Sequence, residues 1–301
     1  MTQQLADRTD YLEFIESELK LPDGSAPGLL VLDLFAGCGG LALGFEAGGF
    51  KTVGFEMLKE ACATYNTNLS GECHEMVLTP GQKLVNDADI IVGGPPCQPF
   101  SVVGLQNGQK DTRDGFPVFL AAVEQYQPKI AIFENVRGML YRNRQYLDQI
   151  LLRLRELGYV VAPKLLNAVN FGVAQNRERL FVVAHRGHWR FPDPLRYPRY
   201  TAGEALGDLA GSAPENAKFL TSSMEAYVAR YEKASQCIRP RDLHLEQPSR
   251  TVTCRNLNGA TGDMLRVLLP DGRRRRLTVR EGARLQSFPD WFEFAGSEGS
   301  Q

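Results

Sequence analysis

The chain has 301 residues, of which 43% are hydrophobic and 23% are charged. This composition is ordinary for a globular protein, and the length suffices for one large domain and a smaller one. The formal net charge is −1, which excludes a strongly basic protein that binds nucleic acid over its whole surface. Any such binding must come from local clusters of basic residues.

The cysteine and histidine spacings argue against a metal or disulfide scaffold. The six cysteines include no C-x-x-C pair, and the four histidines complete no zinc-finger pattern. The N-terminus has no apolar signal core, and no stretch reaches transmembrane length. We therefore expect a soluble, reduced, cytoplasmic protein with no structural metal and no membrane partner.

Apolar runs alternate with helical patterns through the first two thirds of the chain. After a polar N-terminal extension over residues 1–28, strands are predicted at 29–35, 51–55, 88–92, 129–133, 160–166 and 180–184. Helices are predicted at 41–47, 59–68 and 145–157. This alternation predicts an α/β fold in which helices cover both faces of a mostly parallel sheet.

The composition changes after His185, where prolines, basic residues and aromatic residues gather up to about residue 248. The segment is either a small second domain or a solvated linker, and composition alone favours neither. Further on, the run Arg273–Arg276 follows a turn at Pro270-Asp271-Gly272. Such a run is usually a solvated hairpin edge, but beside a nucleic-acid cleft it would contact phosphates.

A glycine-rich turn follows the first predicted strand, in the segment Asp33-Leu34-Phe35-Ala36-Gly37-Cys38-Gly39-Gly40. Such turns approach NAD, FAD or S-adenosylmethionine closely, and some bind no ligand. Glu56 ends the second strand, where a carboxylate accepts the hydroxyl groups of an adenosine ribose. Because the G-x-G-x-x-G pattern of pyrophosphate sites is absent, the turn favours S-adenosylmethionine over NAD.

A cysteine follows another predicted strand. The apolar run Ile90–Gly94 leads into Pro95, Pro96 and Cys97, so the thiol lies at the carboxyl edge of the sheet, where open α/β folds place their chemistry. The two prolines restrict the backbone before the thiol and aim it. Cys97 is therefore a candidate nucleophile, and a NAD-dependent dehydrogenase would leave the Pro-Pro-Cys-Gln segment unexplained.

Three charged residues lie near other strand ends. Glu134 is a candidate general acid or hydrogen-bond partner, although a lone glutamate there is more often a helix cap or a surface residue. Arg177 and Arg179 precede the strand at 180–184, where one would form a structural ion pair and the other would bind an anion or a carbonyl oxygen.

Together these segments resemble the DNA (cytosine-5) methyltransferases of bacterial restriction-modification systems. The resemblance covers roughly residues 29–294. In chain order, its motifs are Asp33–Gly40, Glu56, Gly94-Pro95-Pro96-Cys97-Gln98-Pro99-Phe100-Ser101, Glu134-Asn135-Val136, Gln175-Asn176-Arg177-Glu178-Arg179, Pro248–Thr253, Leu277–Glu281 and Arg284–Pro289.

The resemblance implies a Rossmann-like, S-adenosylmethionine-dependent methyltransferase sheet with a small target-recognition domain. The catalytic domain would span 29–185, the target-recognition domain 186–255, and a return segment 256–301. Cys97 would attack a flipped-out cytosine, Glu134 would hold its N3 and amine, Arg179 would contact O2, and Arg177 would support the Cys97 loop. Residues 98 to about 115 resemble a loop that closes over the base. The cofactor residues would be Phe35, Ala36, Gly37, Gly39, Gly40, Glu56, Met57 and Pro96.

The expected product is S-adenosylhomocysteine, and the expected partners are double-stranded DNA and a cognate restriction endonuclease. Two departures from the family pattern stand out. The acidic residue that binds the adenine amine has only Glu75 as a candidate, and the usual Gly-Asn-Ala-Val helix does not follow Pro289. We therefore expect a shortened chain, a second polypeptide that supplies this helix, or a weakened enzyme. The alternatives are a tRNA cytosine-5 methyltransferase and a non-catalytic subunit.

Overall fold

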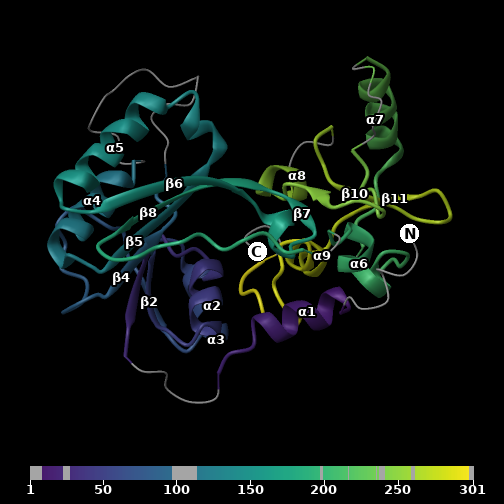
Figure 1. Ribbon diagram of the computed structural model, residues 1–301. Helices are drawn as coiled ribbons and strands as arrows, with labels where there is room; N and C mark the ends of the chain where they lie inside the picture. Colours follow the sequence, from purple (N-terminus) through teal and green to yellow (C-terminus); the bar gives the residue numbers. More distant parts are fainter. Residues whose placement is uncertain are drawn as a thin grey trace. The chain divides into compact units, whose positions relative to one another are not determined.

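The computed structural model describes residues 9–22, 28–96, 114–196, 199–215, 217–234, 236, 241–258 and 262–297 (Figure 1). The chain divides into two compact units. The larger, called here the sheet unit, comprises residues 19–166, 178–193 and 293–301. The other, called the small unit, comprises residues 1–18, 167–177 and 194–292.

A seven-stranded sheet forms the centre of the sheet unit, with strand order β3-β2-β1-β4-β5-β8-β6. The pairs among β3, β2, β1, β4 and β5 are parallel, and β5 pairs antiparallel with β8. The strands are β1 Leu30–Leu34, β2 Lys51–Glu56, β3 Glu72–Glu75, β4 Ile90–Gly93, β5 Ile130–Val136, β6 Val160–Asn167 and β8 Glu178–His185. This confirms the predicted α/β class and the mostly parallel sheet.

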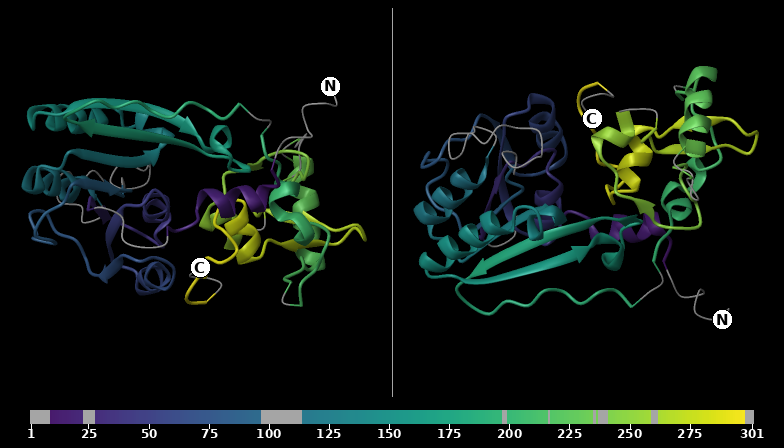
Figure 2. Two further views of the ribbon diagram at one scale, coloured as in Figure 1. Left: turned by 60° about the horizontal axis from the view of Figure 1, so that its bottom comes forward. Right: turned by 90° about the horizontal axis from the view of Figure 1, so that it is seen from above.

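Helices cover both faces of this sheet (Figures 1 and 2). The helices are α2 Gly40–Ala47, α3 Lys59–Asn68, α4 Phe116–Tyr126 and α5 Arg144–Glu156, with the short 3-10 helix η1 at Arg137–Leu140. Helices α4 and α5 pack on one face, and α2 and α3 on the other. Successive residues of a strand point to opposite faces, so β1 places Leu32 and Leu34 towards α4 and α5 and Val31 towards the other face.

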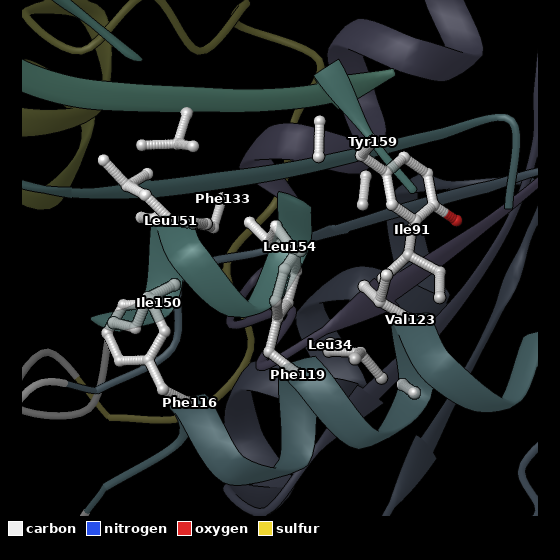
Figure 3. Packing of buried hydrophobic residues seen from close by; sticks show 14 of the residues in the cluster. Leu34, Ile91, Phe116, Phe119, Val123, Phe133, Ile150, Leu151, Leu154 and Tyr159 are labelled. Atoms are coloured by element: carbon white, nitrogen blue, oxygen red, sulfur yellow. The ribbon is translucent and has the colours of Figure 1, made fainter. Parts of the chain in front are cut away.

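The largest hydrophobic core lies between the sheet and helices α4 and α5 (Figure 3). Helix α5 contributes its buried residues at helical spacing, and α4 contributes Phe116 and Phe119. Each of these large side chains stabilises the fold by about 1.5–3 kcal/mol when buried. This core holds the strand ends in fixed positions at the carboxyl edge of the sheet.

The small unit consists of short elements. They are α1 Tyr11–Glu18, η2 Ala168–Phe171, α6 Ala202–Leu206, η3 Gly207–Leu209, α7 Ser222–Ala234, α8 Cys254–Asn258 and α9 Val279–Arg284, with the strand pairs β7 Gln175–Asn176 and β9 Ser249–Arg250, and β10 Arg266–Leu268 and β11 Arg274–Arg276. This unit extends to residue 292 and includes two earlier segments, and the target-recognition domain at 186–255 stays a prediction.

Buried ion pairs hold the small unit together. The guanidinium group of Arg275 is fully buried, and it contacts both carboxylate oxygens of Glu281 at 2.7 and 2.8 Å. Arg274 bridges Asp242 and Glu225. The structure thus corrects the interpretation of this arginine run, because Arg274 and Arg275 are neither a solvated hairpin edge nor free to contact phosphates. Burial makes such pairing obligatory, since an unpaired buried charge is strongly destabilising.

Candidate active site at the carboxyl edge of the sheet

The glycine-rich turn between β1 and α2 has an unusual backbone. Phe35, Gly37 and Gly39 have positive φ values of 61°, 54° and 90°. A Cβ atom on Gly39 would lie 2.7 Å from Leu69 Cδ1, so that position also lacks room for a side chain. Phe35 is a non-glycine residue in a strained conformation, a feature that clusters at functional sites. Gly37 instead faces open space, with no described atom within 4 Å of its Cβ position, so a ligand can approach its backbone.

Glu56 ties this turn to the end of β2. Its Oε2 accepts the Gly37 N–H at 2.9 Å, and its Oε1 accepts the N–H groups of Met57 and Leu58, both at 2.9 Å. A carboxylate has about four acceptor sites, so these bonds leave room for a further donor such as a hydroxyl. Met57 and Leu58 are 63% and 56% exposed, which places apolar side chains beside a carboxylate. This combination suits a nucleoside, which has an apolar base and a hydroxylated sugar.

Asp33 is a site residue to which the sequence prediction gave no role. It lies in β1, its side chain is fully buried, and neither carboxylate oxygen has a hydrogen-bond partner among the described residues. Burial, followed by repulsion from Glu56, raises the pKa of Asp33 to about 8. The only available signal was an acidic residue inside the apolar strand Leu30–Leu34. An unpaired buried carboxylate suits a ligand that brings a positive charge.

The segment Pro95–Pro96 follows β4 at the same edge. The buried Asn135 donates from Nδ2 to the Pro95 carbonyl at 2.9 Å. Gly94 lies close to Glu134, because a Cβ atom on Gly94 would be 3.8 Å from Glu134 Oε2. The structure therefore brings the end of β4 and the end of β5 together. Cys97, the predicted nucleophile, lies outside the described residues, as does the predicted loop up to residue 113.

Glu134 and Arg179 form an ion pair across β5 and β8. Arg179 Nε lies 2.6 Å from Glu134 Oε1, and the two side chains are 17% and 24% exposed. In the antiparallel register Glu134 faces Phe181, so Arg179 is its diagonal neighbour on the same face of the sheet. Arg179 Nη1 also donates to the Glu178 carbonyl at 2.9 Å. Both side chains are partly accessible, so a planar ligand with several polar atoms can approach this pair.

Arg177 lies in the small unit, unlike Arg179. Its guanidinium group donates to the Val252 carbonyl at 3.3 Å, and its backbone N–H donates to Asn167 Oδ1 at 3.0 Å. The predicted support of the Cys97 loop by Arg177 stays a prediction. Glu75, the candidate for the adenine amine, is an exposed residue at the end of β3 in register with Glu56.

Within the described ranges, no helix is both long and apolar enough to cross a membrane. Among the same residues, no three or more His, Cys, Asp or Glu side chains are grouped so that they could hold a metal ion.

The glycine-rich turn, Glu56, the Pro95–Pro96 segment and Glu134 lie at the carboxyl ends of four strands of this sheet. This arrangement indicates a class of enzyme. Residues 29–301 match the family described as C-5 cytosine-specific DNA methylase, and the chain belongs to that family. The enzyme is thus a DNA (cytosine-5) methyltransferase of the type II restriction-modification kind.

Curated relatives agree with this assignment. Over 299 residues the chain is 60% identical to the type II methyltransferase M.AplI of Arthrospira platensis, and the match covers 99% of this chain and 86% of the relative. It is 32% identical to M.NgoFVII of Neisseria gonorrhoeae, covering 89% and 79% of the two chains. The prediction that a second polypeptide supplies a further helix is not tested by these matches.

Solved structures share the fold. A DNMT2 variant from Spodoptera frugiperda superposes with a TM-score of 0.69 at 16% identity, covering 89% of this chain and 91% of that one. A putative DNA modification methyltransferase from an Escherichia coli prophage gives a TM-score of 0.61 at 21% identity, with the same two coverages. At these identities the likeness concerns the fold alone.

Proposed function

We propose that the enzyme transfers a methyl group from S-adenosylmethionine to carbon 5 of a cytosine in a short, specific duplex sequence, and that the cytosine leaves the helix for the reaction. The observation that carries this proposal is the Glu134–Arg179 ion pair beside the Pro95–Pro96 segment that leads to Cys97. A base inside a duplex cannot reach such a site, so extrusion is required.

Cys97 is proposed as the nucleophile because carbon 5 of cytosine is a poor nucleophile within an aromatic ring. The Cys97 thiolate bonds to carbon 6, which breaks the aromaticity and makes carbon 5 electron-rich. Carbon 5 then takes the methyl group, a base removes the carbon-5 proton, and the carbon–sulfur bond breaks to release the thiolate. The ring regains its aromaticity as 5-methylcytosine.

Glu134 and Arg179 are proposed to hold the pyrimidine during these steps. Glu134 binds N3 and the exocyclic amine and favours protonation of N3, which drains electron density from carbon 6. Arg179 contacts O2 and stabilises negative charge on the ring. The direct contact between the two side chains supports this assignment, since it places a donor and an acceptor next to each other for one flat ligand.

The methyl donor is proposed to lie over the glycine-rich turn, with Phe35 and Met57 against the adenine and Pro96 near the methionine part. S-adenosylmethionine supplies an electrophilic methyl group and leaves as S-adenosylhomocysteine. Glu56 would accept the ribose hydroxyls, and Ala36, Gly37, Gly39 and Gly40 would supply the backbone. The Asp33 carboxylate, which has no hydrogen-bond partner among the described residues, fits a ligand that carries an ammonium and a sulfonium group.

Sequence recognition is proposed for residues 186–255, because they are rich in basic and aromatic side chains. A cognate restriction endonuclease and a location in the bacterial cytoplasm, where the DNA is, complete the proposal. Which sequence is recognised depends on side chains in irregular segments.

Radiolabel transfer from S-adenosylmethionine to duplex DNA tests the proposal. We expect transfer by the wild-type enzyme, none by Cys97→Ser, and unchanged transfer by Thr67→Ala, which alters an exposed residue of α3. Transfer that survives Cys97→Ser would refute the covalent route. Preferential labelling of tRNA offered beside DNA would favour the tRNA alternative, and specific DNA retention without any transfer would favour a non-catalytic subunit.

A further inference from the structure

The carbonyl groups of Pro95 and Pro96 are held from two different elements. Asn135, at the end of β5, donates to the Pro95 carbonyl at 2.9 Å. Gly115, which precedes α4, donates its backbone N–H to the Pro96 carbonyl at 2.9 Å. Proline has no N–H group, so these carbonyls are the only backbone hydrogen-bonding groups that the two residues offer. Both are occupied, which fixes the orientation of two successive peptide groups.

Steric crowding, and not backbone conformation, excludes a side chain at Gly115. Its φ and ψ of −85° and −11° suit any residue. A Cβ atom there would lie 2.5 Å from Pro96 Cδ, 2.8 Å from Phe35 Cζ and 3.0 Å from Pro95 Cβ. Two proline rings and an aromatic ring therefore close around this glycine, and a single added methyl group must displace at least one of them.

The backbone around Gly115 is itself anchored. Asp114 Oδ1 accepts the Phe116 N–H at 3.1 Å, and its other oxygen accepts a short hydrogen bond from the Tyr146 hydroxyl of α5. Phe116 is fully buried against Phe133 of β5, with ring centroids 5.1 Å apart. Gly115 thus belongs to a rigid part of the sheet unit, and it cannot move aside to accept a side chain.

We propose that Gly115 and Asn135 are positioning residues that set the direction in which the chain leaves Pro96 towards Cys97. The Pro96 carbonyl belongs to the planar peptide group that includes the Cys97 nitrogen, so a bond that orients one orients the other. Through Phe35, Gly115 also links this direction to the turn proposed to bind the methyl donor. The inference rests on the proposed covalent function of Cys97.

The main test is Gly115→Ala. We expect kcat for methyl transfer, and the rate of trapping on duplexes that contain 5-fluorocytosine, to fall at least about tenfold, because small displacements of a reacting group have effects of this size or larger. The Kd for unmodified duplex DNA is expected to stay within about threefold. The matched control is Gly44→Ala, an exposed position of α2 with no described atom within 4 Å of the Cβ position, and it should leave both rates unchanged.

A second variant, Asn135→Ala, loosens the same segment from the other side without adding any atom. It should also lower kcat and the trapping rate while DNA affinity is kept, and it decides the question if Gly115→Ala does not fold. In the double variant the losses should be less than additive on a logarithmic scale, because both residues act on one segment.

The outcomes separate this inference from the function on which it rests. If the wild-type enzyme never forms the trapped complex, the proposed function fails. If the wild-type enzyme is trapped and Asn135→Ala is trapped at the same rate, the positioning role is overturned. A fall in DNA affinity that matches the fall in kcat, together with a lower melting temperature, would mean a merely structural role and would also overturn it.

Discussion

Two fully buried charged side chains, one in each unit, differ in their partners. In the small unit, the fully buried Arg275 contacts both oxygens of Glu281, and the buried Arg266 reaches Asp242 and Glu232. In the sheet unit, the fully buried Asp33 has no hydrogen-bond partner among the described residues. Paired buried charges serve the fold, because leaving one unpaired is strongly destabilising. For Asp33 we propose that a bound ligand supplies the missing partner.

The comparison also separates two kinds of arginine. Arg275 has no exposed surface and forms an ion pair with Glu281. Arg179 is also paired, but it is still partly exposed at the edge of the sheet. Complete burial therefore excludes Arg275 from contact with a substrate, whereas Arg179 keeps some accessible surface. Both belong to short segments rich in arginine, so the sequence alone does not divide them.

The largest expected effect concerns the sheet unit. Glu134→Gln should lower kcat for methyl transfer on the order of 10²–10⁴-fold, the range for loss of a general acid or base, with little change in the melting temperature. The measurement is radiolabel transfer at saturating DNA and cofactor. Glu178→Gln is the control, because Glu178 is an exposed neighbour that pairs with Arg137. Equal losses in both variants would contradict the assigned role of Glu134.

The next effect concerns the small unit. Arg275→Met should lower the free energy of unfolding by about 3–5 kcal/mol, because Glu281 is left as a buried, unpaired charge. Urea denaturation measures it. Arg275→Met combined with Glu281→Met should recover most of the loss, and Arg273→Met, at a side chain that is 61% exposed, should cost less than about 1 kcal/mol. If Arg275→Met also lowers the free energy of unfolding by less than about 1 kcal/mol, burial does not distinguish the contributions of these two arginines.

The raised pKa of Asp33 predicts that the free energy of unfolding depends on pH. Its pKa is raised from 3.8 to about 8 on folding. Its contribution to stability is thus fully present below the unfolded pKa and is lost as the pH rises through about 8. Asp33→Asn should remove this loss, so in urea denaturation the stability of the variant relative to the wild-type protein rises between about pH 4 and pH 8 and then levels off. Parallel pH profiles for the two proteins would show that Asp33 is paired or uncharged throughout.

The same residue predicts proton release on cofactor binding. A cationic ligand beside Asp33 lowers the pKa of the carboxyl, so binding near pH 7 should release up to about one proton. Calorimetry of S-adenosylmethionine binding, without DNA, in two buffers of different ionisation enthalpy measures it. Asp33→Asn should bind more weakly and release no proton from this site. Proton release that persists in the variant would point to another group.

The smallest expected effect is the loss of a helix cap in the small unit. The Thr201 hydroxyl accepts the Glu204 N–H at 3.2 Å, and Glu204 in turn accepts the Thr201 N–H. Thr201→Ala should cost about 1 kcal/mol in urea denaturation and leave kcat unchanged. Thr67→Ala, on the exposed side of α3, is the control and should cost little. A change in kcat with Thr201→Ala would link this cap to catalysis.

Local patterns in the sequence predicted most of the sheet unit. Strands β1, β2, β4, β5, β6 and β8 and helices α2, α3 and α5 occur where apolar runs and helical spacing indicated them. Helix α4 was not predicted, because its residues Phe116–Ala122 are apolar on nearly every side and so carry no helical period. The direction of β8 was not predicted either, since an apolar run has the same pattern in either direction.

For the candidate site, the sequence determined which residues follow each strand, namely the turn at Phe35–Gly40, Glu56, Pro95–Cys97 and Glu134. Only the tertiary structure decided which polar groups meet. It paired Glu134 with Arg179, placed Arg177 in the small unit and buried Arg275. It also left Asp33 with no hydrogen-bond partner in the described part of the chain. The physical reason is the separation along the chain of the groups that determine each property. Strand and turn patterns depend on neighbours in the chain, whereas hydrogen-bond satisfaction and burial depend on groups brought together from distant segments.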